Sequence, residues 1–287
     1  MLSALVSVDG RLLSCSIKER LFHCREHMDR NPITKVLRAL SWLIQEPSGS
    51  TGVREMAAAM GLSPSSAHRL LTALADEGFV RQDPVSSKYL LGVEFYRLAN
   101  IAAAKAPIRQ AALKHMQRLV EACNETALLG IFDDLKQEMI FVARVESKHA
   151  LRYAVDLNQW IPVYAGASGL AIMAFLSDSE IESIIARTRL TPVTDLSITE
   201  PYRLQMELQK IRARGAAVSR GHRVQGAVGL AAPIFGPSGK VVGDICLTIP
   251  EQRFDALAED HILDLLRACA LSITEEIGGR ITDKQAA

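Results

Sequence analysis

The chain has 287 residues, of which 48% are hydrophobic and 23% charged, with a formal net charge of +1. This composition is typical of a globular protein with one large domain or, as we expect here, two. There is no basic or acidic tail, so any contact with nucleic acid must come from a local patch. No apolar run reaches the roughly 18 residues of a membrane span, and Asp9 and Arg11 interrupt the stretch where a secretory signal needs an apolar core. We therefore expect a cytoplasmic protein without membrane attachment.

Cysteine and histidine patterns give no support for a metal site. The five cysteines are widely spaced, odd in number and contain no CxxC pair, so we expect reduced thiols. His23 and His27 are four residues apart, but no Glu lies between them in a zinc-binding pattern and no Cys pair accompanies them. The chain also lacks GxxxxGK[ST] and GxGxxG motifs for nucleotide phosphates. We expect no metal and no cofactor.

Residues 1–31 have no clear helical pattern, and regular periodicity begins only after Met28. We expect an N-terminal extension that is loosely ordered or translated from an upstream start. An ordinary helix around Ser16–Asp29 is the alternative.

A winged helix-turn-helix is predicted for residues 32–92. A first helix begins at Ile33, and a second covers "VREMAAAM" and ends at Gly61, which suits a left-handed C-cap. Ser63 and Pro64 begin a third helix that runs to Glu77. Two short strands around the Asp83-Pro84 turn then add a wing. The apolar face expected for the first helix consists of Val36, Leu37, Leu40 and either Leu43 or Trp42.

The third helix is predicted to be the element that enters the major groove of double-stranded DNA. Its buried stripe is expected to be Ala67, Leu70, Leu71 and Leu74. The opposite face offers short polar side chains with one His and one Arg, which suit base edges and phosphates. The local charge is mildly favourable, with 8 Lys/Arg and 6 Asp/Glu between Pro32 and Lys105. The predicted DNA-binding residues are Ser63, Ser65, Ser66, His68, Arg69, Thr72, Arg81 and Lys88.

An Ala-rich helix over residues 93–106, apolar on several sides, is predicted to link the two domains and to pack against a partner chain. Residues 107–287 then mix helices and strands without regular βαβ alternation. We therefore predict an α+β domain with a mainly antiparallel sheet. Its expected strands include "TALLGIF", "EMIFVARVES", "LRYAVDL", "GAVGLAAPIF" and "KVVGDICLTI", and its expected helices include one entered from "YAGASGLAIMAFL".

These segments resemble the IclR family of transcriptional regulators. In the N-terminal half the resemblance lies in "REMAAAMGLSPSSAHRLLTALADEGFVRQD" followed by "KYLLG". In the C-terminal half it lies in "IPVYAGASGLAIMA", "IRARGAAVSRGHRVQGAVGLAAPIF" and "VVGDICLTIPEQR". Together they cover residues 33 to about 254. The resemblance implies a GAF-like effector-binding domain and a homodimer or homotetramer. It also implies a palindromic operator and a small-molecule effector that modulates operator binding, as repressor or activator.

The effector site implied by this resemblance comprises Gly166, Ala167, Ser168, Ser219, Arg220, His222, Arg223, Gly229, Cys246 and Thr248. Family members often have acidic residues where this chain has "SRGHR", which leaves the ligand open. Independently, "AGASG" before a helix favours an anion, and the nearby Arg and His side chains favour a carboxylate. We therefore expect an organic acid. The alternative is that Arg220 and Arg223 are surface charges and "AGASG" is a tight turn. We expect apolar walls from Leu129, Leu151, Tyr153 and Trp160.

Two other functions are weighed against a ligand-responsive transcription factor. In a small-molecule sensor, the winged helix would mediate protein contacts. In an enzyme, "AGASGLA" would hold a catalytic Ser168, but a G-x-S-x-G elbow needs Gly at position 170, where this chain has Leu. We therefore do not expect an enzyme.

Overall fold

The computed structural model of the protein describes residues 31–281, which form two compact units divided between Ala102 and Ala103. The extension predicted over residues 1–31 lies outside the described residues except for Asn31, and so does the His23–His27 pair. Among residues 31–281, no helix combines the length and apolar character that a membrane span needs. The predicted α+β fold, with an N-terminal helix-turn-helix and a C-terminal domain built on an antiparallel sheet, is confirmed.

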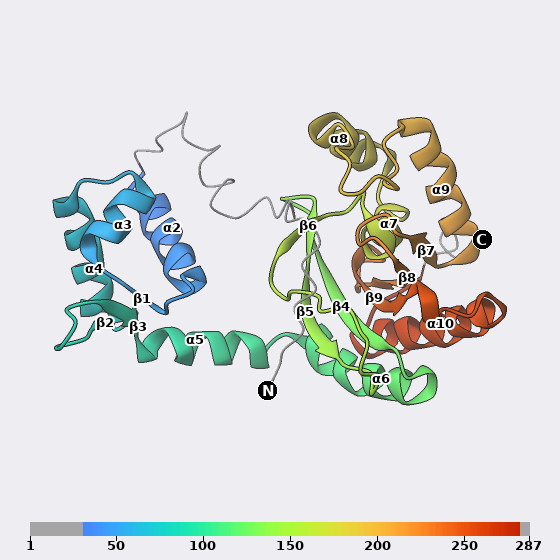
Figure 1. Ribbon diagram of the computed structural model, residues 1–287, viewed down its shortest axis with the longest axis horizontal. Helices are drawn as coiled ribbons and strands as arrows, with labels where there is room; N and C mark the ends of the chain where they lie inside the picture. The colour runs from blue at the N-terminus through green and yellow to red at the C-terminus, as the bar shows by residue number, and fades with distance from the viewer. Residues whose placement is uncertain (1–30, 282–287) are drawn as a thin grey trace. The chain divides into compact units, whose positions relative to one another are not determined.

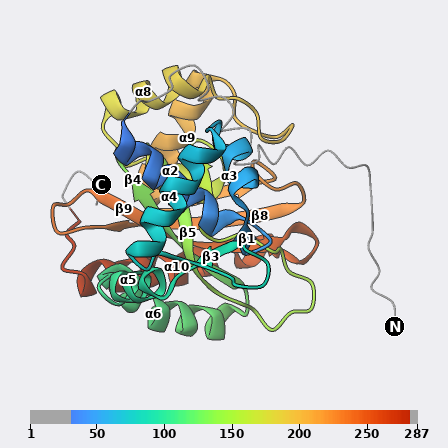
Figure 2. The same cartoon turned by 90° about the vertical axis from the view of Figure 1, so that its left-hand side faces the viewer.

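The first unit is a winged helix-turn-helix (Figure 1). Three helices lie together, and three short strands form an antiparallel sheet in the order β1-β3-β2. Figure 2 views the same unit with α4 in the foreground. Strand β1 was missed, because two residues are too few to show an alternating pattern. The elements are α2 (Pro32–Gln45), β1 (Ser50–Thr51), α3 (Val53–Met60), α4 (Pro64–Asp76), β2 (Val80–Gln82) and β3 (Tyr89–Leu91).

The turn between α3 and α4 is built as the sequence predicts. Gly61 ends α3 with φ of 65°, a left-handed conformation that favours glycine. Ser63 caps α4, because its hydroxyl oxygen accepts a hydrogen bond from the Ser66 amide at 3.2 Å. The expected core face of α2 is partly wrong. Leu37 is 60% exposed, and the buried residues of this helix are Ala39 and Leu43.

Helix α5 (Val93–Ala104) follows the wing and contains no buried residue. Its large apolar side chains include Val93, Tyr96 and Ile101, which are 78%, 55% and 40% exposed. A helix that is apolar on several sides and unburied in the single chain is typical of one that packs in an assembly.

The second unit is a six-stranded antiparallel sheet covered by helices on both faces (Figure 1). The strand order is β6-β5-β4-β9-β8-β7. Its strands are β4 (Thr126–Asp133), β5 (Glu138–Val145), β6 (Trp160–Pro162), β7 (Ala217–Arg220), β8 (Ala227–Phe235) and β9 (Val241–Pro250). Its helices are α6 (Pro107–Cys123), α7 (Gly166–Met173), α8 (Asp178–Thr188), α9 (Pro201–Arg214) and α10 (Glu259–Glu276), with short 3-10 turns η2 (Glu251–Arg253) and η3 (Ala256–Ala258).

Each face of this sheet has its own apolar core, since successive residues of a strand point to opposite faces. On one face, Leu128, Phe141 and Cys246 belong to the core cluster that contains α7. On the other, Leu129 and Ile245 belong to the cluster that contains α6 and α10. The neighbours Leu128 and Leu129 therefore serve different cores, and the face under α7 is the one that borders the candidate site.

The strand predicted for "LRYAVDL" is wrong, because residues 151–157 are a loop between β5 and β6. Two of its backbone carbonyls accept hydrogen bonds from arginine side chains and not from the backbone of a neighbouring strand. Arg253 donates to the Leu151 carbonyl at 2.9 Å, and Arg144 donates to the Val155 carbonyl at 3.0 Å. The alternation of apolar and polar residues in this segment arises because one side of the loop packs against the core, where Val155 is 7% exposed.

Candidate functional site

A cavity of about 40 Å³ lies in the second unit, at the start of α7 and over the sheet face formed by β8 and β9. Nine of the ten residues proposed for an effector site line it: Gly166, Ala167, Ser168, Ser219, His222, Arg223, Gly229, Cys246 and Thr248. They come from α7, β7, the β7–β8 turn, β8 and β9. Residues far apart in the sequence are therefore brought to one place.

The tenth residue, Arg220, does not line the cavity. It is the last residue of β7, and the burial of this strand alternates, so Ser219 is buried while Arg220 is exposed. The Arg220 guanidinium instead forms an ion pair with Glu259 at 2.6 Å and lies 4.9 Å from the centre of the Phe254 ring. Arg220 is therefore placed outside the cavity that the other nine residues line.

The apolar walls are also different from those expected. Leu129 points into the core on the opposite face of the sheet. Leu151 and Tyr153 line a separate surface hollow, and Trp160 is covered by the Lys136 ammonium at 3.7 Å. The walls are formed by Met139, Phe141, Ile161, Val224 and Ala227. Periodicity alone does not reveal these residues, because they come from separate strands and a turn.

The first turn of α7 lies at the cavity, where Gly166, Ala167 and Ser168 line it. Its N-cap, Ala165, has no side chain that can accept a hydrogen bond, so the amides of this turn lack a capping partner. Gly166 has φ of 80°, and a Cβ at this position would lie 3.1 Å from Cβ of Arg223. Glycine thus allows the helix start and Arg223 to approach closely. A helix N-terminus beside a guanidinium favours an anion.

Arg223 is partly buried and forms no hydrogen bond or ion pair that the structure of residues 31–281 records. Its guanidinium lies 5.3 Å from the centre of the Phe141 ring. Burial lowers the pKa of Arg223, while Cys246 and Asp244 act in the opposite direction. A guanidinium removed from water without a partner is costly, so an anionic ligand would stabilise it.

Other polar atoms at the cavity or behind its lining are buried without a hydrogen-bond partner in the described part of the chain. They are Ser168 Oγ, His222 Nδ1 and both carboxylate oxygens of Asp244. Burial lowers the pKa of His222, which favours the neutral imidazole. Buried polar groups normally have partners, so several orphaned atoms at one cavity indicate a place for a polar ligand.

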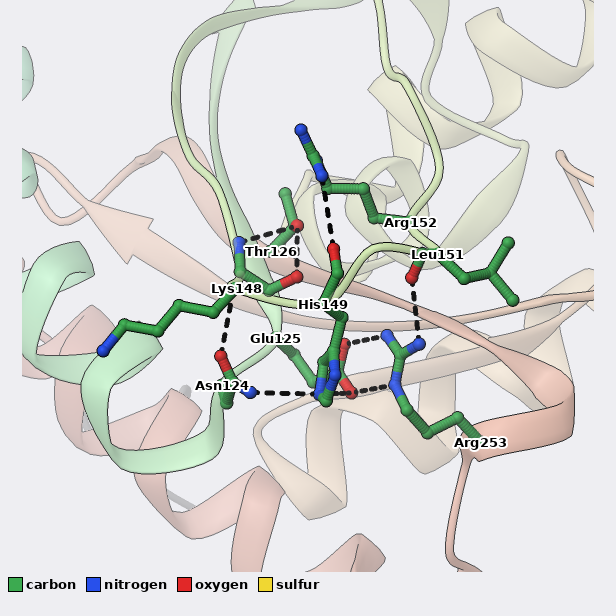
Figure 3. Close-up of polar contacts among 9 residues, drawn as sticks. Asn124, Glu125, Thr126, Lys148, His149, Leu151, Arg152 and Arg253 are labelled. Carbon is green, nitrogen blue, oxygen red and sulfur yellow. Dashed lines mark hydrogen bonds and ion pairs between the residues drawn. The ribbon is translucent and has the colours of Figure 1, made fainter. Parts of the chain in front are cut away.

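A loop over residues 146–159 is fastened beside this site by a polar network (Figure 3). Glu125, which is 6% exposed, accepts two hydrogen bonds from Arg253 at 2.7 and 2.8 Å. This bidentate contact raises the pKa of Arg253. Asn124 accepts from the Lys148 amide at 3.0 Å. Tyr153 then donates to the Gln225 carbonyl at 3.1 Å, which joins the loop to the turn that holds His222 and Arg223.

The exposed face of α4 has the side chains that the sequence predicted. Ala67, Leu71 and Leu74 are buried, and Leu70 is partly buried. Ser65, His68, Arg69 and Thr72 are exposed, and Ser66 is partly exposed. With the other described residues, His68 and Arg69 form no hydrogen bond or ion pair, which leaves both side chains available to a partner.

The wing holds the other two predicted cations. Arg81 is exposed on β2, whereas Lys88 forms an ion pair with Glu55 of α3 at 3.3 Å. The turn itself is fixed by Asp83, whose carboxylate accepts from the Ser86 hydroxyl at 2.5 Å and from the Val85 amide at 3.2 Å. These hydrogen bonds lower the pKa of Asp83. An exposed pair such as Lys88–Glu55 is weak, so a phosphate can replace Glu55.

Comparison with known proteins assigns both units of the chain to one family. Residues 32–84 match the model of the IclR helix-turn-helix domain, and residues 101–275 match that of the bacterial transcriptional regulator IclR C-terminal domain. The chain belongs to the IclR family. As an IclR-family member it is a transcriptional regulator with a DNA-binding helix-turn-helix domain and a C-terminal ligand-binding domain.

Curated and solved relatives of this IclR-family regulator align over most of their length. The HTH-type transcriptional regulator KipR of Bacillus subtilis is 28% identical over 246 residues, which cover 86% of this chain and 96% of that protein. The crystal structure of a putative IclR transcriptional regulator from Silicibacter is 27% identical, with a TM-score of 0.75, covering 88% and 98% of the two chains. An IclR homologue from Microbacterium hydrocarbonoxydans, complexed with 4-hydroxybenzoate, shares the fold with a TM-score of 0.75 at 23% identity, covering 85% and 98%.

Proposed function

We propose that this regulator senses a small organic acid in the cavity beside α7, and that binding of the acid changes its affinity for operator DNA. The observation that carries the proposal is the unpaired guanidinium of Arg223 next to the uncapped first turn of α7. Both groups favour an anion, and a carboxylate can accept hydrogen bonds from both at once.

The cavity limits what it can hold without rearrangement. Its volume of about 40 Å³ is far below the roughly 300 Å³ of a typical ligand pocket. An acid of several heavy atoms therefore requires the wall to move outward. The turn carrying His222 and Arg223 is the part of the wall that the Tyr153 hydroxyl ties to the loop over residues 146–159.

The DNA-contacting residues are proposed to be the exposed face of α4 and the cations of the wing. On this proposal Arg69, His68 and Thr72 face base edges in the major groove, and Ser65 and Ser66 contact phosphate near the start of the helix. Ser63 acts mainly as the helix cap, because its hydroxyl already bonds within the α4 start. Arg81 and Lys88 contact phosphates and position the helix.

The link between the two sites is proposed to be α5. Its exposed apolar side chains support a homodimer or homotetramer, and a dimer suits a palindromic operator with half-sites about 34 Å apart. A ligand that favours one arrangement of the α5 helices would change the spacing of the two α4 helices. This same coupling would serve a repressor or an activator.

Titration calorimetry with benzoate, pyruvate and glycolate, and with neutral benzamide and glycerol, tests the ligand class. Arg223→Gln is expected to weaken the binding of an acid by about 10- to 100-fold, since hydrogen bonds to charged groups contribute about 1.5–3 kcal/mol. Arg220→Gln is the matched control, because it removes an arginine three residues away that lies outside the cavity. Binding of the neutral compounds alone, or equal loss in both variants, would refute the proposal.

Gel-shift titration on the DNA flanking the gene tests the α4 face. Arg69→Ala is expected to weaken binding by about 1–3 kcal/mol if Arg69 contacts a base, and to do so mainly at one operator position. Glu77→Ala is the control, since Glu77 lies at the far end of the same helix. Unchanged affinity and salt dependence in Arg69→Ala would show that another face contacts DNA.

A further inference from the structure

Asp244 is a fully buried carboxyl group next to the proposed effector cavity, with 0% of its surface exposed. It lies on β9, two residues before Cys246 and four before Thr248, so the three side chains share one face of the strand. Cys246 and Thr248 line the cavity, and Asp244 lies beyond them on the same face. Neither of its oxygens has a hydrogen-bond partner in the described part of the chain.

The sheet leaves room for this carboxyl group. Gly130 faces Asp244 on β4, and a Cβ at Gly130 would lie 1.9 Å from Asp244 Oδ1 and 2.7 Å from Met139 Cε. On the other side Pro233 of β8 faces Asp244. None of these neighbours has a side-chain donor, so the sheet itself offers the carboxylate no compensation for lost hydration.

The charged and titratable groups that act on Asp244 come from the cavity. They are Ser168 of α7, Arg223 of the β7–β8 turn and Cys246 of its own strand. The neighbouring strands contribute only the uncharged residues Gly130 of β4, Met139 of β5 and Pro233 of β8. Burial raises the pKa of Asp244 to about 7. The Ser168 hydroxyl, which is near Asp244 but outside hydrogen-bond geometry, and the charge of Arg223 act in the opposite direction. Burial also raises the pKa of Cys246 to about 12, so this thiol is neutral. Arg223 is therefore the cation that favours ionised Asp244.

We propose that Asp244 takes up one proton from solvent when an acid binds to Arg223, so that the cavity accepts a monocarboxylate together with a proton. The inference rests on the function proposed above. The ligand carboxylate cancels the charge of Arg223 that favours ionised Asp244. Two carboxylates beside one guanidinium would leave a buried negative charge, which is costly enough that one group binds a proton instead. The new O–H bond forms on Asp244, the proton comes from water or buffer, and Arg223 keeps its own protons.

This coupling specifies the class of effector. The cavity offers one positive charge, because the lowered pKa of His222 keeps its imidazole neutral near pH 7. A monocarboxylate is balanced by Arg223 once Asp244 is protonated. A dicarboxylate such as succinate brings a second negative charge for which the described cavity has no cation, so it is expected to bind more weakly than a monocarboxylate of similar size.

Calorimetry with benzoate and pyruvate, in two phosphate-free buffers of different ionisation enthalpy at each pH, counts the protons taken up. We expect uptake of nearly one proton at pH 8 and much less at pH 6, where Asp244 is already protonated. The affinity should fall about tenfold per pH unit above pH 7. Asp244→Asn is expected to bind without proton uptake and with an affinity independent of pH. Binding to the wild type at pH 8 without proton uptake, or equal uptake in Asp244→Asn, would overturn the inference.

A second measurement needs no ligand. Infrared difference spectra of the free protein should show the C=O stretch of a protonated carboxylic acid that titrates near pH 7 and is missing in Asp244→Asn. Arg223→Gln should move this midpoint upward by about 1 pH unit or more, whereas Arg220→Gln should not. An unchanged midpoint in Arg223→Gln refutes the coupling even if no acid binds. Failure of every acid to bind, with the midpoint shifted as expected, refutes the proposed ligand class instead.

Discussion

Leu71→Ala tests whether the winged helix is stabilised by a core of its own. Leu71 is fully buried in a cluster of seven buried residues: Ala39, Leu43, Met56, Leu71, Leu74, Val80 and Tyr89. A Leu→Ala change at such a site costs about 3–5 kcal/mol. A unit of about 70 residues has a stability of roughly 4–10 kcal/mol, so this loss is a third of the total or more. For a domain of this size, 3 kcal/mol lowers Tm by about 12–24 °C.

Differential scanning calorimetry measures this effect for each unit separately. The second unit has two core clusters that share no residue with that of the winged helix, so its transition is expected to stay in place. Thr72→Ala is the matched control, since the exposed neighbour should change stability by no more than about 0.5 kcal/mol. If Leu71→Ala lowers both transitions equally, the two units unfold as one. A loss in Thr72→Ala as large as that in Leu71→Ala would refute the assigned buried face of α4.

Three further predictions concern the second unit, each measured by urea unfolding. Gly130→Ala should lower the free energy of unfolding by about 1–3 kcal/mol, because its Cβ would overlap with Asp244 Oδ1. Adding Asp244→Ala should restore most of this stability, and no recovery would show that the strain lies elsewhere. Folding raises the pKa of Asp244 from 3.8 to about 7, so the native state binds more protons than the unfolded chain in this range. The free energy of unfolding should therefore fall as the pH rises from about 4 to 7. Parallel pH curves for Asp244→Asn and the wild type would contradict this. Arg253→Leu should cost about 2 kcal/mol, because it removes both hydrogen bonds of the guanidinium to buried Glu125 and leaves only His149 nearby, at 3.9 Å. Adding Glu125→Leu should reduce the loss, and additive losses would show that the pair is not coupled.

The winged helix could be predicted closely from the sequence because its signals are local. Gly61 with a positive φ, Ser63 as a cap and the Asp83 turn each depend on residues within a few positions of one another. The exposed face of α4 follows from helical periodicity in the same way. The error at Leu37 arose because a helix with apolar residues on several sides has more than one plausible core face, and packing against neighbours selects one.

The cavity depends on contacts between segments that are distant in the sequence. The family resemblance predicted most of the residues that line the cavity, but it placed both Arg220 and Arg223 there. The strand and the turn that follow one another in the chain decide that only Arg223 lines it. Arg220 is the exposed last residue of β7, and Gly221 then reverses the chain with φ of 72° so that Arg223 reaches the cavity. The strand predicted for residues 151–157 is a loop, because its backbone carbonyls bond to side chains from elsewhere in the chain.

By itself, the sequence determined the helix-turn-helix with its helix caps, the exposed face of α4 and the family, since these follow from local spacing and from motifs along the chain. Only the tertiary structure decided which arginine lines the cavity and which residues form its walls. It also showed that Asp244, an ordinary acidic residue in the sequence, is buried without a partner between Gly130 and Pro233. The physical reason is that burial is a property of packing: hydration, and with it the pKa of a carboxyl group, is set by neighbours that the sequence alone does not bring together.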